Sequence, residues 1–153
     1  MEINPLRDGI DHINVYSRSK TAIGKMLSNF CPCSLKTRDG EFHSVEAYWY
    51  WLGIEDCPEK EILRTLSGNE AKSAGKDLKK IKGRRLDDAF EEKILDAILQ
   101  KMYQNKELVL SSKVLPLEHY YVFNSKVVNV KAKHKWMIAG IEKIRQNILK
   151  GEI

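Results

Sequence analysis

The stretch HSVEAYWYWLG, residues 43–53, marks the point at which the hydrophobic pattern changes its period. Four apolar residues in it follow the spacing i, i+3, i+4 and i+7, which places them on one face of a helix: Val45, Tyr48, Trp49 and Leu52. Strand-like segments precede this stretch and helical spacing predominates after it. The sequence therefore predicts an α+β fold that is predominantly α-helical, with a few short strands.

The segments on both sides of this stretch predict further elements. Upstream, Ile13 and Val15 within residues 10–19 predict a strand, residues 34–38 predict a second one, and we expect a tight turn at Asp39-Gly40 after it. Residues 119–130 predict a hairpin that turns at Asn124-Ser125. Helical patterns begin at Pro58 and cover about residues 70–80, 87–105, 106–112 and 137–151.

Length and composition describe one soluble domain. The chain has 153 residues, of which 42% are hydrophobic and 31% charged, and a domain commonly has roughly 100–200 residues. We therefore expect a single domain over residues 1–153. No apolar run approaches the ~18–20 residues that span a bilayer, and residues 1–14 lack the pattern of a secretory signal. These features predict a cytoplasmic protein that does not contact a membrane.

Basic residues exceed acidic ones, 26 to 21, which gives a net charge of +5 and favours partners that carry phosphate. Part of the excess forms a basic strip between Lys72 and Arg85, opposed within it only by Asp77. Such a strip is commonly a solvated helix face, and it also fits a DNA backbone or a nucleotide pyrophosphate. Its members are Lys72, Lys76, Lys79, Lys80, Lys82, Arg84 and Arg85.

The sequence lacks the motifs of several other chemistries. It contains no phosphate-binding loop, no dinucleotide fingerprint, no HExxH zinc motif and no GxSxG elbow. The three cysteines, even with His43, have poor spacing for a zinc site: Cys31, Cys33 and Cys57. We expect no metal, no cofactor and reduced thiols.

Glu46 is the most informative carboxylate. An acidic residue in the first turn of a helix is common and favourable, but Glu46 is followed closely by four consecutive aromatic residues, 48–51. A carboxylate among apolar groups is costly to bury and is also how a site positions an acid or a base. Four successive aromatics point in every direction around a helix, so one or two of them are candidates to line a pocket for a flat ligand.

An ordered set of motifs resembles the NADAR superfamily, the YbiA-like N-glycosidases. The motifs cover roughly the first half of the chain: INVYSRS (13–19), LSNFCPCSL (27–35), GEFHSVEAYW (40–49) and GNEAKSAGK (68–76). The resemblance implies a mostly α-helical domain that hydrolyses an N-glycosidic bond between a ribose and an amine or nucleobase nitrogen. Its implied substrates are phosphoribosylamino intermediates of riboflavin synthesis, or ADP-ribose attached to other molecules, including DNA guanine.

The resemblance carries family residues onto named positions. The glutamate of the family's SVE segment falls on Glu46, which would stabilise an oxocarbenium-like transition state and activate water. We expect the helix N-terminus to favour its ionised form. The family's SNF segment falls on Ser28, Asn29 and Phe30, and its AKxxG[RK] segment falls on Lys72, Gly75 and Lys76. We expect Asn29 to hold the ribose hydroxyls and the two lysines to hold phosphate. Besides these family positions, we expect substrate contacts from His43, Ser44 and Trp49.

The second half departs from the family pattern. Many members carry a DxxWG turn and a GxNxLG helix start, where this chain has LEHYYVFNSKVV and KAKHKWMIAGI. This difference predicts an altered leaving-group pocket, to which His119 or Trp136 would contribute the missing contacts.

The function that we prefer from the sequence is removal of ADP-ribose from guanine in DNA, which reverses a toxin-type modification. The basic strip favours it, because such a strip is surplus for a small metabolite. Three alternatives stay open: an N-glycosidase of phosphoribosylamino-pyrimidines, a non-catalytic binder of ADP-ribose or nucleic acid, and an ordinary DNA-binding module.

Overall fold

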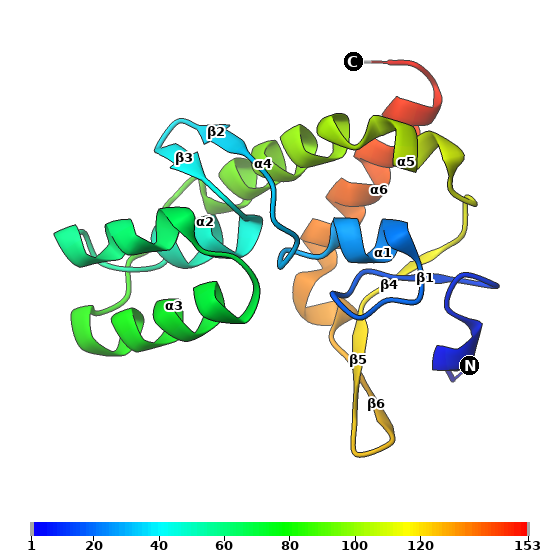
Figure 1. Cartoon of the computed structure of the whole chain (residues 1–153), viewed down its shortest axis with the longest axis horizontal. Helices are drawn as coiled ribbons and strands as arrows, with labels where there is room; N and C mark the ends of the chain where they lie inside the picture. The colour runs from blue at the N-terminus through cyan, green and yellow to red at the C-terminus, as the bar shows by residue number, and fades with distance from the viewer. Residues whose placement is uncertain (1, 153) are drawn as a thin grey trace. The chain divides into compact units, whose positions relative to one another are not determined.

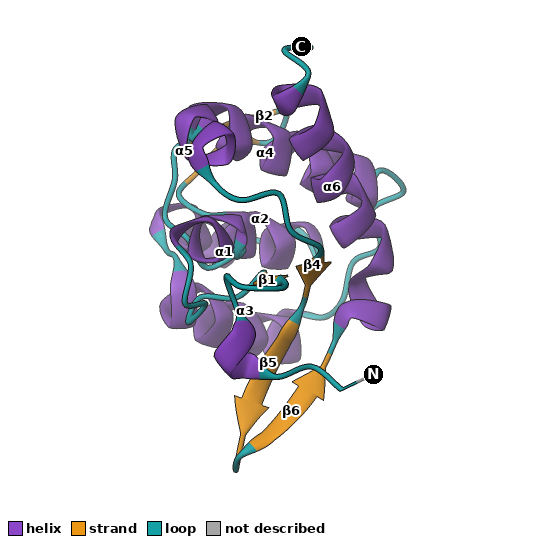
Figure 2. Ribbon diagram, turned by 90° about the vertical axis from the view of Figure 1, so that its right-hand side faces the viewer, coloured by secondary structure: helices purple, strands orange, loops and turns teal. Residues whose placement is uncertain are grey.

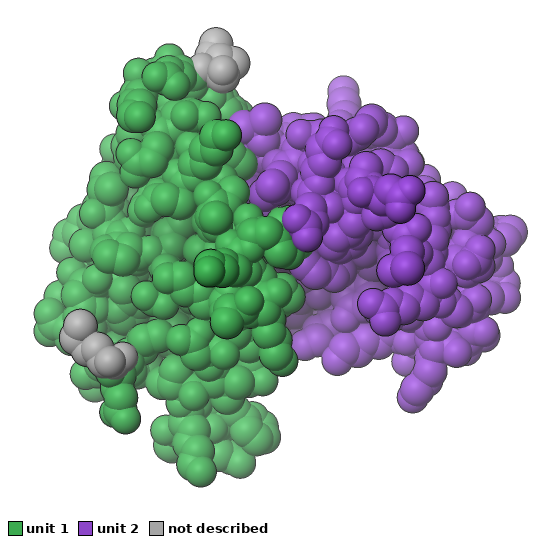
Figure 3. Space-filling model, turned by 180° about the vertical axis from the view of Figure 1, so that it is seen from behind, with its two compact units in different colours: residues 1–28, 102–153 green, residues 29–101 purple. Residues whose placement is uncertain are grey.

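The computed structural model describes residues 2–152 (Figure 1). The chain divides into two compact units (Figure 3). Unit 1 contains residues 2–28 and 102–152, and unit 2 contains residues 29–101. Helices predominate and the strands are short (Figure 2). The predicted α+β, predominantly helical class is thereby confirmed, whereas the expectation of one domain stays a prediction.

Unit 2 packs a β-hairpin and a 3₁₀ helix around helix α2. The hairpin is antiparallel and turns at Arg38-Asp39, one residue earlier than the expected Asp39-Gly40 turn, because Gly40 already pairs with Thr37 as the first residue of β3. Most of helix α4 also belongs to this unit, and its last residues continue into unit 1. The elements of unit 2 are β2 (Leu35–Thr37), β3 (Gly40–Phe42), α2 (Val45–Leu52), η2 (Pro58–Thr65), α3 (Gly68–Lys82) and α4 (Phe90–Gln104).

Helix α3 approaches α2 closely at Gly75. A Cβ atom built on Gly75 would overlap the ring of Tyr50 and lie 2.6 Å from its Cβ atom. The two helices therefore meet with a backbone against a ring, and only glycine leaves room for this contact. This close approach fixes where the lysines of α3 lie relative to Glu46 on α2.

Unit 1 is held together by a polar cluster beneath a parallel strand pair, β1 with β4. The buried Asp8 carboxylate accepts hydrogen bonds from the backbone of Asn14 and Lys20 and from the Ser19 hydroxyl, at 2.8–2.9 Å. The Asn14 side chain bonds the backbone of Tyr120 in both directions. The elements of unit 1 are η1 (Pro5–Arg7), β1 (Ile13–Asn14), α1 (Ala22–Leu27), α5 (Lys106–Ser111), β4 (Leu117–Glu118), β5 (Tyr120–Phe123), β6 (Lys126–Asn129), η3 (Lys131–His134) and α6 (Lys135–Leu149).

The structure corrects three other details of the sequence analysis. Helix α1 replaces part of a region that we expected to hold only strands and turns, and the helix beginning at Pro58 is 3₁₀ rather than α. The strand expected around Ile13 and Val15 covers only Ile13–Asn14, which pairs with the two residues of β4. No helix within residues 2–152 is long and apolar enough to cross a membrane.

Candidate functional site

The N-terminus of α2 holds Glu46 in place. The Ser44 hydroxyl caps the helix by accepting the Ala47 N–H at 3.0 Å, and it donates to the Leu66 carbonyl at 2.9 Å. The Glu46 N–H donates to the Asn29 carbonyl at 3.0 Å. The segment of residues 27–35 therefore lies beside the start of α2. Ser44 is fully buried and both functions of its hydroxyl are used, which gives it a capping role. Its expected contact with substrate stays a prediction.

The Glu46 carboxyl is the strongly perturbed acid of this cluster. Burial raises the pKa of Glu46 to about 7, and the nearby charges of Lys72 and Lys76 act in the opposite direction. Within residues 2–152 its carboxylate makes no hydrogen bond and no ion pair that would fix it. Desolvation of the carboxyl thus outweighs the favourable charges around it. That the helix N-terminus favours the ionised form of Glu46 stays a prediction.

Two lysines of α3 supply the positive side of the site. Lys72 and Lys76 lie one turn apart, both are exposed, and both act on the Glu46 carboxyl. The Lys72 ammonium also lies 6.0 Å from the centroid of the Phe30 ring, at the outer limit of a cation–π contact. The two lysines thus lie near the Glu46 carboxyl, the Asn29 backbone bonds the Glu46 backbone, and Phe30 lies near Lys72. Flexible exposed cations beside a half-buried acid suit a ligand that carries phosphate.

Lys72→Ala is expected to raise the pKa of Glu46 further, by about 0.5–1 unit, because it removes the cation that most stabilises the carboxylate. A carbon-detected NMR titration of the Glu46 carboxyl measures this without any substrate. Lys80→Ala is the matched control, since it removes an exposed lysine of the same helix that lies outside the pair of cations acting on Glu46. An unchanged Glu46 titration in the Lys72 variant would remove the lysine from the site.

The four consecutive aromatics have different surroundings. Tyr48 is buried and donates its hydroxyl to Asp39 at 2.7 Å, and Trp51 packs under the Lys60 ammonium at 3.8 Å from its ring centroid. Trp49 is partly exposed and meets Phe90 edge-on, with ring centroids 4.9 Å apart. Two of the four are thus core residues, and the role of Trp49 as a ligand contact stays a prediction.

Tyr50 is a candidate that the sequence analysis did not single out. It is partly exposed, and both burial and the charge of Glu46 raise the pKa of its hydroxyl. Its position four residues after Glu46 was the available signal, because residues i and i+4 share a helix face. Tyr50 therefore joins Glu46 and Lys72 in the cluster, and its ring also abuts Gly75.

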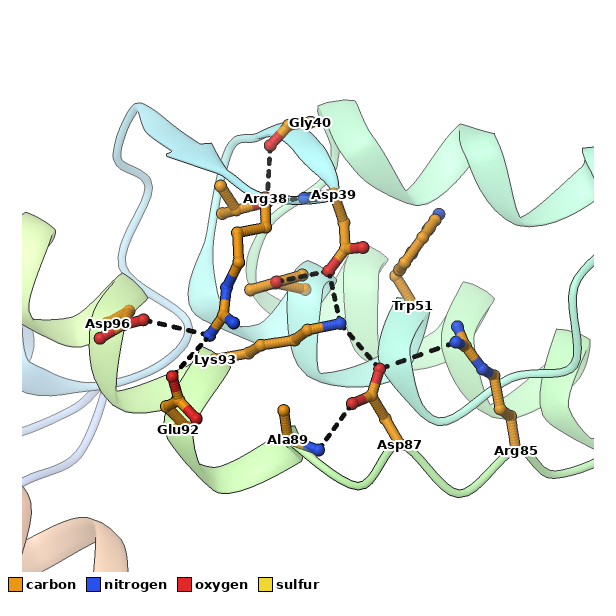
Figure 4. Close-up of polar contacts among 12 residues, drawn as sticks. Arg38, Asp39, Gly40, Trp51, Arg85, Asp87, Ala89, Glu92, Lys93 and Asp96 are labelled. Carbon is orange, nitrogen blue, oxygen red and sulfur yellow. Dashed lines mark hydrogen bonds and ion pairs between the residues drawn. The ribbon is translucent and has the colours of Figure 1, made fainter.

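A half-buried ion network supports this part of unit 2 (Figure 4). The Lys93 ammonium lies between Asp39 and Asp87, at 3.1 and 2.9 Å, and Asp39 in turn accepts the Tyr48 hydroxyl. Asp87 also lies 3.7 Å from Arg85. The network ties the turn between β2 and β3 to the start of α4, and through Tyr48 it fixes the helix that carries Glu46.

The basic strip is smaller in the structure than in the sequence. Lys82 pairs with Glu59 at 2.7 Å, and Arg85 pairs with Asp56 and Asp87. The sequence count missed these acids because they lie outside residues 72–85. Five exposed cations of the strip make no ion pair within residues 2–152: Lys72, Lys76, Lys79, Lys80 and Arg84.

For the other expected site residues, the structure gives contacts that do not involve the Glu46 carboxyl. His43 is exposed, and its backbone bonds Cys33 and Arg64. Three lie in unit 1, where Ser28 is the buried C-cap of α1, Trp136 is in the first turn of α6, and the His119 Nδ1 atom lies 2.8 Å from the Val15 carbonyl. Burial lowers the pKa of His119. Their contacts with substrate stay predictions.

No group of three or more potential metal ligands among His, Cys, Asp and Glu occurs within residues 2–152. All three cysteines are free thiols and partly exposed. Burial raises the pKa of the Cys33 thiol to about 11.

Comparison with known proteins finds a similar fold but no similar sequence. No family model matches the sequence, and no curated protein matches it. Among solved structures, the chain is similar to the NMR structure of the Escherichia coli protein YbiA. The TM-score is 0.66 and the sequence identity is 20%, and the match covers 92% of this chain and 86% of YbiA. The chain thus has a YbiA-like α+β fold.

Proposed function

We propose that this protein belongs to the NADAR superfamily and hydrolyses the bond between C1′ of a ribosyl group and a nitrogen atom. The substrate proposed is ADP-ribose attached to guanine in DNA. One observation carries the proposal: the Glu46 carboxyl has a pKa near neutrality, and two exposed cations act on it. The YbiA-like fold also supports it, because the family suggested by the sequence motifs has that fold.

Glu46 would serve the reaction in its ionised form. Cleavage of a ribosyl C1′–N bond passes through an oxocarbenium-like transition state, which a nearby carboxylate stabilises. The same carboxylate takes a proton from the attacking water, and a base works best when its pKa lies near the working pH. Partial burial strengthens both effects, since charges interact more strongly where water is excluded.

The rest of the cluster would hold the substrate. Lys72 and Lys76 bind the pyrophosphate as cations, and Phe30 offers a ring face to a base or sugar. The Asn29 amide is assigned to the ribose hydroxyls, since its backbone already lies against Glu46. Lys79, Lys80 and Arg84 extend the positive charge beyond these two lysines, which favours a DNA backbone over a small metabolite. The free thiols are typical of a reducing compartment, and we place the protein in the cytoplasm.

The rate of hydrolysis is expected to rise with pH on its acidic side with a midpoint near 7. Glu46 must lose its proton to act as a base, and its pKa is raised from 4.5 to about 7. Measuring kcat/KM from pH 5 to 9 on an ADP-ribosylated oligonucleotide tests this. A midpoint near 4.5 would mean that an ordinary exposed carboxyl limits the rate.

Substrate choice is tested by offering the purified protein two compounds in parallel. The proposal expects release of ADP-ribose from an ADP-ribosylated guanine in a short DNA and little cleavage of a phosphoribosylamino-pyrimidine. The reverse preference would assign the protein to metabolite clearance. Tight binding of ADP-ribose without turnover of either compound would make it a binder.

A further inference from the structure

The hairpin of β5 and β6 carries an exposed aromatic face that the proposed active site does not use. In its antiparallel register Tyr121 pairs with Val128 and Phe123 pairs with Lys126. Because side chains alternate along a strand, these four residues share one face of the hairpin. Tyr121 is 39% exposed and Phe123 is 64% exposed. Two rings therefore face solvent two residues apart.

The hairpin has a regular backbone that sets the spacing of these two residues. Asn124 and Ser125 both adopt left-handed backbone angles, with φ of 50° and 62°, as a tight two-residue hairpin turn requires. All four residues of each strand are paired, and the hairpin extends away from the helices of its unit (Figure 2). Phe123 lies at the last pair before the turn.

The surrounding chain is strongly basic. Residues 119–141 contain four lysines and no aspartate or glutamate. Lys131 lies 3.6 Å from Glu118, whereas Lys126, Lys133 and Lys135 make no ion pair within residues 2–152. On the opposite face of the hairpin, Tyr120 and Val122 line a hollow of about 250 Å³, which Arg18 and Lys20 also line.

We propose that the Tyr121–Phe123 face of this hairpin binds an unstacked single strand of nucleic acid. Residues i and i+2 of a strand are separated by about 7 Å, which is about twice the 3.4 Å rise per base of a stacked strand. Each ring can thus take one base of an extended strand, while lysines bind the phosphates. Rings beside cations are the usual platform for single strands. A lipid surface fits less well, because Lys126 shares the face and the tip with Phe123.

This inference names the form of the substrate for the proposed function. The effect that we expect on turnover rests on that proposed function. An enzyme that acts on a base in a duplex must take that base out of the stack or use single-stranded substrate. A platform for unstacked bases therefore makes the substrate a nucleic-acid polymer with an exposed base.

The test is binding of a fluorescein-labelled, unmodified 12-nucleotide DNA strand, followed by anisotropy. Tyr121→Ala/Phe123→Ala is expected to weaken binding by about 10–100-fold, the effect of losing two stacking contacts. Phe123→Trp keeps a ring and should bind as the wild type does, whereas Phe123→Leu keeps only apolar bulk and should bind weakly. The matched control is Leu110→Ala/Val114→Ala, which removes two exposed apolar side chains elsewhere in unit 1.

Equal affinity of the wild type and the double alanine variant, with equal melting temperatures, would overturn the inference. So would binding to phosphatidylserine vesicles that depends on Phe123 while DNA binding does not. Hydrolysis separates the two proposals: the double variant should lose turnover of an ADP-ribosylated oligonucleotide but keep that of ADP-ribosylated guanosine monophosphate. If the wild type cleaves neither compound, the proposed function fails, and the DNA titration alone decides the role of the hairpin.

Discussion

Glu46→Gln is expected to lower kcat for ADP-ribose release by about 1,000-fold, while the Kd for ADP-ribose changes little. Glutamine keeps the size of the side chain but cannot become an anion or accept a proton from water. General-base catalysis contributes roughly 10²–10⁴-fold, and a carboxylate that also stabilises an oxocarbenium-like transition state belongs in the upper part of that range. Single-turnover kinetics on an ADP-ribosylated oligonucleotide measures the loss, and calorimetry with ADP-ribose measures the binding.

Stability measurements show whether the loss of activity in Glu46→Gln comes from the reaction step or from unfolding. The pKa of Glu46 is raised on folding from 4.5 to about 7, so its protonated form stabilises the fold below pH 4.5 and this contribution is lost as pH rises through 7. Glu46→Gln should therefore be more stable than the wild type at pH 8, by up to roughly 3 kcal/mol, and nearly equal at pH 4. Glu55→Gln, at an exposed acid in the same unit, should change neither activity nor stability. Hydrolysis by the Glu46 variant at the wild-type rate would remove Glu46 from the mechanism.

Gly75→Ala is expected to destabilise the protein by about 3 kcal/mol, at the upper end of what overpacking costs. The added methyl group would overlap the Tyr50 ring, and that ring is itself fixed between two helices. The helices must separate or Tyr50 must leave its place, and either change also displaces Lys72 and Lys76 from Glu46. Urea unfolding monitored by circular dichroism gives the free energy of unfolding.

Gly53→Ala is the matched control for this prediction. A Cβ atom there would meet its nearest neighbours at 3.6 and 3.8 Å, which is ordinary contact, and its φ of −92° suits any residue. The Gly53 variant should therefore unfold within about 1 kcal/mol of the wild type. Equal stability of the two alanine variants would contradict the close approach of α2 and α3.

The sequence predicted those elements whose signal is local. The helix at Val45–Leu52 and the hairpin that turns at Asn124-Ser125 both follow from short-range periodicity and turn residues. Helix α1 was missed because it has six residues and contains Gly24, and its position depends on packing. A Cβ atom on Gly24 would lie 2.6 Å from the Ser19 Cβ atom, a contact that no local pattern predicts.

The chemistry of the site depends on contacts between residues that are far apart in the sequence. The motif order pointed to Glu46, but its pKa is set by burial and by lysines more than 25 residues away. The same is true of the basic strip, where Lys82 and Arg85 are neutralised by Glu59 and Asp56. Residue types and spacing thus predict which groups are candidates, whereas the charge that each one carries follows from the fold.

The most direct test of the proposed reaction is the mass of the DNA product. Two N-glycosidic bonds meet at an ADP-ribosylated guanine, one to the ADP-ribosyl group and one to the deoxyribose of the strand. Our account predicts that the purified protein returns the oligonucleotide to the mass of the unmodified strand and releases free ADP-ribose. An abasic strand, or a strand that keeps its full modified mass after long incubation, would contradict it.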